Sequence, residues 1–78
     1  MNREEAVKIV TSMLEKNVDG LEMSEDKMGE KLVDLGVDSL DVMLVIMDVG
    51  DASGITISDD QAEILDTPEK IAEFITKE

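Results

Sequence analysis

The sequence contains no cysteine and no histidine, and these two absences remove much of the chemistry a protein can carry. Without cysteine the chain has neither a disulfide framework nor a thiolate metal site. Without histidine it lacks the commonest general base and the commonest ligand of transition metals. We therefore expect no metal site and no catalytic activity of the chain's own. Any reactive thiol must come from a cofactor or a partner.

Basic residues are also scarce, since 7 Lys and Arg stand against 20 Asp and Glu, for a net charge of −13. Such a charge repels nucleic acids and anionic membranes and attracts proteins with basic patches, although it also serves plain solubility. The longest apolar run, Val42 to Met47, is far too short to span a membrane, and the first residues contain no apolar signal segment. We expect no nucleic-acid partner, no membrane insertion, and a monomeric, cytoplasmic protein.

The 78 residues are enough for one small domain, residues 1–78, whose core is too thin to shelter a deep active site. Hydrophobic residues make up 42% of the chain and recur in periodic runs, so we expect a folded domain despite the high charge. Both features favour a carrier or interaction module over an enzyme.

The first half of the chain predicts one helix and one long connection. Apolar residues recur at three- and four-residue spacing over residues 3–16, which is typical of an amphipathic helix. Residues 17–37 are polar and contain three glycines, so they are predicted to form a long loop. Leu32, Val33 and Leu35 are expected to pin the end of this loop to the core.

The second half predicts three more helices. One begins after Asp38 as N-cap and stops at Gly50, and a short one runs from the Ser58 capping box to about Leu65. The last opens at Thr67-Pro68. No pair of strands is indicated, so the predicted fold is an all-α four-helix bundle with three main helices, one short helix and a long first loop. The residues expected to line its core are Val45, Ile46, Val49, Ile55, Ile57, Ile64, Leu65, Ile71, Phe74 and Ile75.

The most informative segment, Asp34 to Asp41, reads Asp-Leu-Gly-Val-Asp-Ser-Leu-Asp. It resembles the attachment motif of acyl carrier proteins, and the resemblance continues to Ile75 through the apolar second helix and the Thr-Pro opening of the last one. The resemblance implies an acyl-carrier fold and a covalent 4'-phosphopantetheine arm on Ser39, derived from coenzyme A. It also implies that the arm carries acyl groups as thioesters for fatty acid, polyketide or related lipid biosynthesis.

The chemistry expected around Ser39 agrees with this implication. At the first position of a helix, backbone N–H groups and the helix dipole favour an attached phosphate. The end of a loop is accessible to a modifying enzyme, and the sequence places no His or Lys base near Ser39 that would make it a self-activated nucleophile. The alternative is an ordinary capping serine.

The resemblance further implies a surface that recognises a phosphopantetheinyl transferase and acyl-transferring or acyl-modifying enzymes with basic patches. Its predicted residues are Asp38, Leu40, Asp41, Val42, Met43, Leu44, Met47, Asp48 and Asp51. For Asp38 the alternative is capping, for Asp41 a solvated face, and for Leu40 core packing. Leu44 and Gly50 stand where such carriers usually place Glu. This departure predicts a more apolar, Met-rich surface and a specialised bacterial member of the family.

Three other classes of protein remain open at this point. A peptidyl or D-alanyl carrier would share the arm on Ser39 but carry aminoacyl groups, although the Asp-Ser-Leu context and the acidity favour acyl groups. A calcium-binding EF-hand loop could span residues 49–60, but Val49 and Asp60 stand where its strongest ligands belong. A pure interaction module would require that Ser39 stay unmodified.

Overall fold

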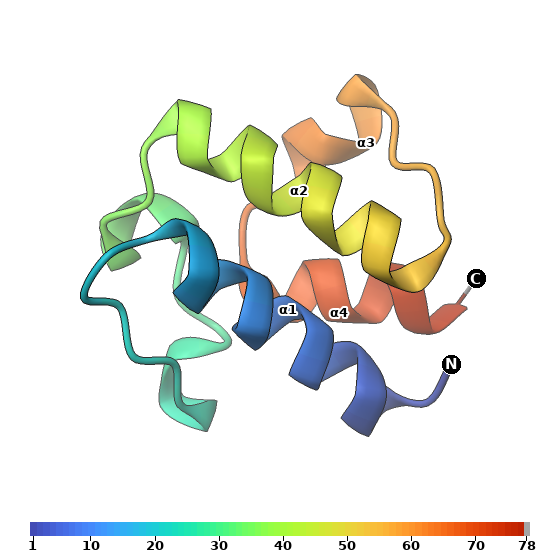
Figure 1. Cartoon of the computed structure of the whole chain (residues 1–78), viewed down its shortest axis with the longest axis horizontal. Helices are drawn as coiled ribbons and strands as arrows, with labels where there is room; N and C mark the ends of the chain where they lie inside the picture. The colour runs from blue at the N-terminus through green and yellow to red at the C-terminus, as the bar shows by residue number, and fades with distance from the viewer. Residues whose placement is uncertain (78) are drawn as a thin grey trace.

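The computed structural model describes residues 1–77, which form four α-helices and no strand, as the sequence predicts (Figure 1). Two short 3-10 helices lie in the first loop. The elements in chain order are α1 (Arg3–Asn17), η1 (Glu25–Lys27), η2 (Leu32–Leu35), α2 (Ser39–Ser53), α3 (Asp59–Ile64) and α4 (Pro68–Lys77). None of the described helices combines the length and apolarity that a membrane crossing requires.

The first helix, α1, begins and ends close to the predicted bounds. The Asn2 side chain caps it by accepting a hydrogen bond from the Glu5 N–H at 2.8 Å, a contact the sequence analysis missed. Ala6, Val10 and Leu14 on its apolar stripe are buried. Through this stripe α1 packs against both α2 and α4 (Figure 1).

The second helix, α2, continues to Ser53, so the predicted stop at Gly50 is wrong. The chain ends the helix at Gly54, whose φ of 74° lies in the left-handed region that glycine adopts without strain. Gly50 has a different role, because a Cβ there would lie 2.8 Å from the Ile55 carbonyl oxygen. Glycine at position 50 therefore permits a close approach of the connection after α2 and does not end the helix.

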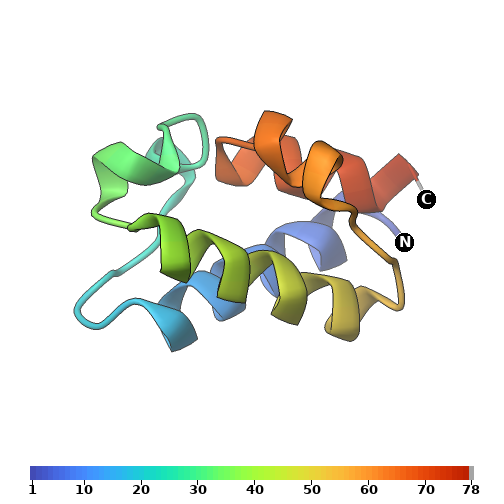
Figure 2. The same cartoon turned by 90° about the horizontal axis from the view of Figure 1, so that it is seen from above.

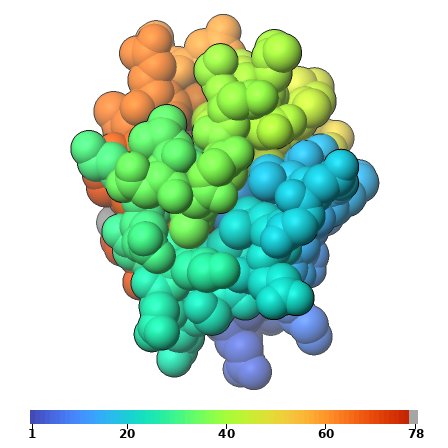
Figure 3. Space-filling model, turned by 90° about the vertical axis from the view of Figure 1, so that its left-hand side faces the viewer, coloured from blue at the N-terminus to red at the C-terminus, as the bar shows by residue number. Residues whose placement is uncertain are grey.

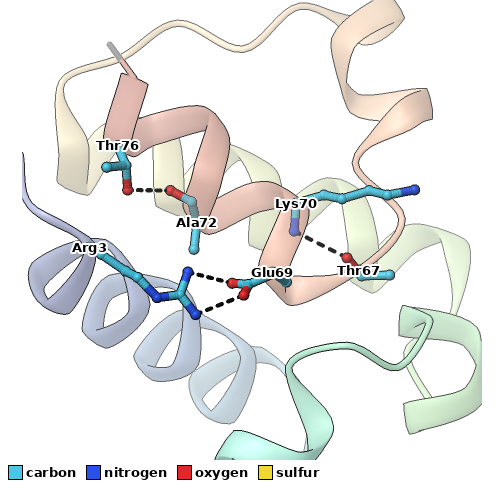
Figure 4. Close-up of polar contacts among 6 residues, drawn as sticks. All are labelled: Arg3, Thr67, Glu69, Lys70, Ala72 and Thr76. Carbon is cyan, nitrogen blue, oxygen red and sulfur yellow. Dashed lines mark hydrogen bonds and ion pairs between the residues drawn. The ribbon is translucent and has the colours of Figure 1, made fainter.

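The two later helices begin as the sequence predicts. Ser58 and Gln61 form the capping box of α3: the Gln61 N–H donates to Ser58 Oγ at 3.2 Å and the Ser58 N–H to Gln61 Oε1 at 3.0 Å. At the start of α4, Thr67 Oγ1 accepts from the Lys70 N–H at 3.1 Å, and Pro68 occupies the first helical position (Figure 4).

The long first loop is held by buried apolar anchors, but Val33 is not one of them. Leu32 is buried and Leu35 half-buried, whereas Val33 is 70% exposed. A 3-10 helix has three residues per turn, so positions 32 and 35 of η2 share the inward face and position 33 points outward. Val18 and Val37, which the sequence analysis did not select, are buried instead.

Backbone hydrogen bonds join the loop to the segment between α3 and α4. The Leu32 N–H donates to the Asp66 carbonyl at 2.9 Å, and the Glu69 N–H donates to the Met28 carbonyl at the same distance. The loop and the α3–α4 junction consequently lie side by side (Figure 2).

Most of the predicted core is confirmed, with Ile55, Ile57 and Phe74 partly buried against it. Ile64 is the exception, since it is 67% exposed. Helix α3 has only six residues, and its inward position is Ala62, followed by Leu65 as C-cap. Ile64 therefore falls on the outer side of α3.

Candidate functional site at the start of α2

Ser39 is the first residue of α2, and its side chain is exposed. The helix is capped by its neighbour, because Asp38 Oδ1 accepts from the Asp41 N–H at 2.9 Å. Among residues 1–77 no hydrogen bond involves Ser39 Oγ, so the capping-serine alternative is wrong. The hydroxyl is left available at a helix N-terminus, where backbone N–H groups favour a phosphate.

The turn before α2 fixes how Ser39 is presented. Gly36 has a φ of 88° and closes η2 by donating its N–H toward the Leu32 and Val33 carbonyls. The next residue, Val37, is buried and anchors the chain before it enters α2. This anchoring turns the start of α2 outward on the face that the first loop also covers (Figure 3).

A cavity of about 570 Å³ adjoins Ser39 and lies between η2, α2 and α3. Its lining is mostly apolar and includes Leu32, Val42, Met43 and Leu65, while Lys31 and three carboxylates also contribute. Lys31, Asp59, Ala62, Glu63 and Asp66 were not predicted from the sequence. They come from the loop, from α3 and from the connection between α3 and α4. Only the tertiary packing brings them to Ser39, so no local pattern could have revealed them.

The predicted recognition residues largely share one surface of α2. Leu40 is 76% exposed, so the core-packing alternative for it is wrong, and Met43, Leu44 and Met47 are exposed as well. The expectation of an apolar, Met-rich outer face is confirmed for these residues. Val42 is half-buried against the core, and Asp41 is half-buried too, whereas Asp38 and Asp51 are exposed.

Asp48 lies apart from this surface and contacts α1. Its Oδ2 accepts from Asn17 Nδ2 at 2.9 Å and lies 3.5 Å from the Lys16 ammonium. The hydrogen bond from Asn17 and then the charge of Lys16 hold the pKa of Asp48 below its usual value. This aspartate joins two helices of the bundle.

The calcium-binding alternative is not supported. Val49 is buried within α2, and residues 49–53 continue that helix instead of starting a loop. Among the described residues, no group of three or more His, Cys, Asp or Glu side chains is placed to hold a metal ion.

Three comparisons with known proteins agree with this geometry. The family model described as "Phosphopantetheine attachment site" matches residues 7–75. An acyl carrier protein of Exiguobacterium sibiricum is 46% identical over 57 residues, which cover 72% of each chain. The chloroplastic acyl carrier protein 5 of Arabidopsis thaliana is 29% identical over 94% of this chain and 52% of its own length.

A solved structure has the same fold. The solution structure of the acetyl actinorhodin acyl carrier protein from Streptomyces coelicolor superposes with a TM-score of 0.70, at 25% identity, covering 99% of this chain and 88% of the other. The chain described here belongs to the acyl carrier proteins, the carriers that hold a phosphopantetheine attachment site.

The residues at the start of α2 fit the group that such a site accepts, 4'-phosphopantetheine. The Ser39 hydroxyl is exposed and makes no hydrogen bond among the described residues, and the first turn of α2 offers backbone N–H groups beside it. The adjoining cavity gives a mostly apolar surface beside the point where an arm would begin.

Proposed function

We propose that Ser39 is the residue that bears 4'-phosphopantetheine. The chain thereby carries acyl groups between enzymes of fatty acid, polyketide or related lipid biosynthesis. The observation that supports this most is the exposed, uncommitted hydroxyl at the first position of α2, beside a mostly apolar cavity of about 570 Å³. When attached, the group supplies a thiol on a flexible arm, which this cysteine-free chain lacks.

The chain's own part in this function is to bind and orient, and we propose that it is not itself an enzyme. No base among residues 1–77 is hydrogen-bonded to Ser39 Oγ, so a transferase must remove the hydroxyl proton during attachment. The first-turn N–H groups of α2 then favour the phosphate linked to that oxygen. The apolar walls of the cavity exclude water from an apolar chain that enters it.

We also propose that the transferase docks on the outer surface of α2. We call this surface the α2 docking face, and its residues are Asp38, Leu40, Asp41, Val42, Met43, Leu44, Met47 and Asp51. An enzyme that modifies Ser39 must contact its surroundings, and Leu40 is its direct neighbour on the helix. The exposed apolar side chains suit an apolar patch on the partner, and the aspartates suit a basic rim, which speeds association. Asp48 is left out because it contacts α1.

Intact mass after incubation with coenzyme A and a promiscuous phosphopantetheinyl transferase tests the attachment site. The full chain should gain the mass of one phosphopantetheinyl group, and Ser39→Ala should gain none. Ser24→Ala is the control, because Ser24 is another exposed serine, lies directly before η1 and makes no side-chain capping bond. The proposal would be contradicted if Ser39→Ala gained the phosphopantetheinyl mass, or if the folded unmutated chain gained no mass.

Transfer kinetics test the α2 docking face. Leu40→Ala should raise the KM of the transferase several-fold, since residues near the centre of an interface contribute most of the binding energy and Leu40 adjoins the residue to be modified. Ile64→Ala should leave KM unchanged, because Ile64 is about equally exposed but lies on the outer side of α3. Equal effects of the two substitutions would count against this surface.

The extent of the domain, the oligomeric state, the location and the specialisation of the carrier are also proposals. Residues 1–78 are proposed to make one carrier domain, because a single apolar cluster joins the four helices, although residue 78 lies outside the described residues. The monomeric state and the cytoplasmic location stay predictions, for light scattering and cell fractionation to check. The apolar α2 docking face supports a specialised carrier, and tight coupling to standard fatty acid ketosynthases would argue against it.

A further inference from the structure

A second cavity, of about 270 Å³, lies farther along α2 on the side that also faces α3. Its apolar lining includes Ile46 and Met47 of α2 and Ile55 and Ile57 of the connection that follows. The first cavity adjoins Ser39 at the beginning of the helix. The two cavities therefore follow one another along α2, away from the attachment site proposed above.

Three residues line both cavities: Met43, Asp59 and Ala62. Ala62 is buried and has only a methyl group, and Asp59 is a charged residue at the exposed start of α3. Met43 alone among the three has a long, unbranched apolar side chain with three rotatable bonds, and it is 42% exposed. Met43 can therefore turn toward solvent or lie between the cavities without breaking any hydrogen bond.

The wall opposite Met43 can also move. Helix α3 has six residues, too few to be stable without tertiary contacts, and the extensive helix contacts of the molecule are those of α1 with α2 and α4. A small shift of α3 would join the two cavities into one channel. The stretch of α2 from Ser39 to Gly50 that borders them rises about 16 Å, at about 1.5 Å per residue.

We propose that Met43 divides the apolar space behind Ser39 into two chambers and so sets the length of acyl group that the protein encloses. Short groups occupy the first cavity, beside Leu32 and Val42. Longer groups displace the Met43 side chain and reach Ile46 and Ile57. This inference rests on the proposed function, because it requires an acyl group carried on an arm that is attached to Ser39.

The test uses the full chain loaded with a series of straight-chain saturated acyl groups of increasing length, with intact mass confirming each loaded form. Backbone amide NMR shifts of Leu32 and Leu65 report on the first cavity, and those of Ile46 and Ile57 report on the second. In the unmutated protein the first pair should respond to the shorter groups, and the second pair only beyond a threshold length.

Two substitutions of Met43 should move that threshold in opposite directions. Met43→Ala removes the divider, so Ile46 and Ile57 should respond to shorter groups than before. Met43→Phe replaces it with a stiff ring, so the same amides should stay unshifted for lengths that shift them in the unmutated protein. Leu44→Ala is the matched control, since Leu44 is the next residue of α2, is 48% exposed, and lines neither cavity.

The outcomes separate this inference from the proposed function. If no form of the chain gains mass, the attachment at Ser39 is wrong. If loading succeeds but the threshold is the same in Met43→Ala, or shifts equally in Leu44→Ala, then Met43 is no divider and the attachment site stands.

Discussion

The two sides of α2 contact very different surroundings. On the inner side Val45 and Val49 are fully buried and Asp48 is bonded to α1. On the outer side Met43 and Met47 meet solvent and border two cavities. Where α2 meets α1 the contacts are extensive, whereas α3 is short and lightly held. The contacts that keep the protein folded are thus separate from the surface that we propose meets cargo and partners.

The largest expected loss of stability comes from a cavity made in the core, where α1 packs against the inner side of α2. Leu14→Ala removes a fully buried side chain of α1 and should cost about 2–5 kcal/mol. A domain of 78 residues has roughly 4–12 kcal/mol in total, so this loss is severe. Met47→Ala, on the outer side, should change stability by no more than about 0.5 kcal/mol. Urea unfolding measures both, and similar losses would erase the contrast between the two sides.

Gly50→Ala should have the next largest effect. Alanine normally stabilises a helix interior relative to glycine, but here its Cβ would meet the Ile55 carbonyl oxygen at 2.8 Å. Because the obstacle is backbone, the connection must move, at a cost of about 1–3 kcal/mol. Gly29→Ala, with no atom within 4 Å of the added Cβ and no positive φ, should be neutral or stabilising by up to about 1 kcal/mol. Thermal unfolding compares the pair, and a stabilised Gly50→Ala would refute the close approach.

Asp38 has two roles, since it caps α2 and also belongs to the proposed α2 docking face. Asp38→Ala should lose about 1 kcal/mol of stability, the usual cost of removing an N-cap. Asp38→Asn retains a capping oxygen and should keep most of that stability while slowing association with the transferase at low salt. Chemical denaturation and stopped-flow association measure the two properties. Unchanged association of the Asn variant would remove Asp38 from the docking face.

The smallest expected effect on stability concerns the ion pair between Arg3 of α1 and Glu69 of α4. Arg3 donates to both carboxylate oxygens of Glu69 at 2.7 Å (Figure 4). The hydrogen bonds from Arg3, and then its charge, hold the pKa of Glu69 below its usual 4.5. A lowered pKa in the folded state adds stability above the ordinary pKa, and that stability is lost as pH falls through the folded value. Arg3 is exposed and Glu69 partly exposed, so solvent screens the pair and its contribution is small.

Glu69→Gln should therefore be slightly less stable than the unmutated protein near neutral pH, and the difference should vanish below the folded pKa. The control is Glu30→Gln, which removes the same charge from a side chain without a hydrogen bond or ion pair in the described part of the chain. If the difference in unfolding free energy between Glu69→Gln and Glu30→Gln does not depend on pH, the Arg3–Glu69 ion pair is not its source.

The sequence predicted the helices and the candidate attachment residue because these depend on local signals. The capping residues Asp38, Ser58 and Thr67 each lie next to the helix they start, and the apolar periodicity that follows is equally local. Gly50 and Ile64 are exceptions, for two different reasons. The close approach of the Ile55 carbonyl to position 50 cannot be read from the helix sequence alone, and a helix of six residues has too little periodicity to define the outward side on which Ile64 lies.

The residues that line the cavity beside Ser39 also could be predicted only in part. Val42 and Met43 follow Ser39 directly on α2, so they could be selected from the sequence. Lys31 and Glu63 come from a loop and from another helix, at sequence distances over which no pattern extends. Tertiary contacts bring these segments to one place, among them the backbone hydrogen bonds between the loop and the α3–α4 junction and the burial of Leu32 and Leu65 in one core.

That Asp38 and not Ser39 caps α2 has one more consequence. Because the aspartate starts the helix, the neighbouring hydroxyl can be esterified or released without unwinding a single turn. If Ser39 is modified as we propose, the capped first turn of α2 is the same in the modified and unmodified forms, so successive enzymes would meet the same helix end.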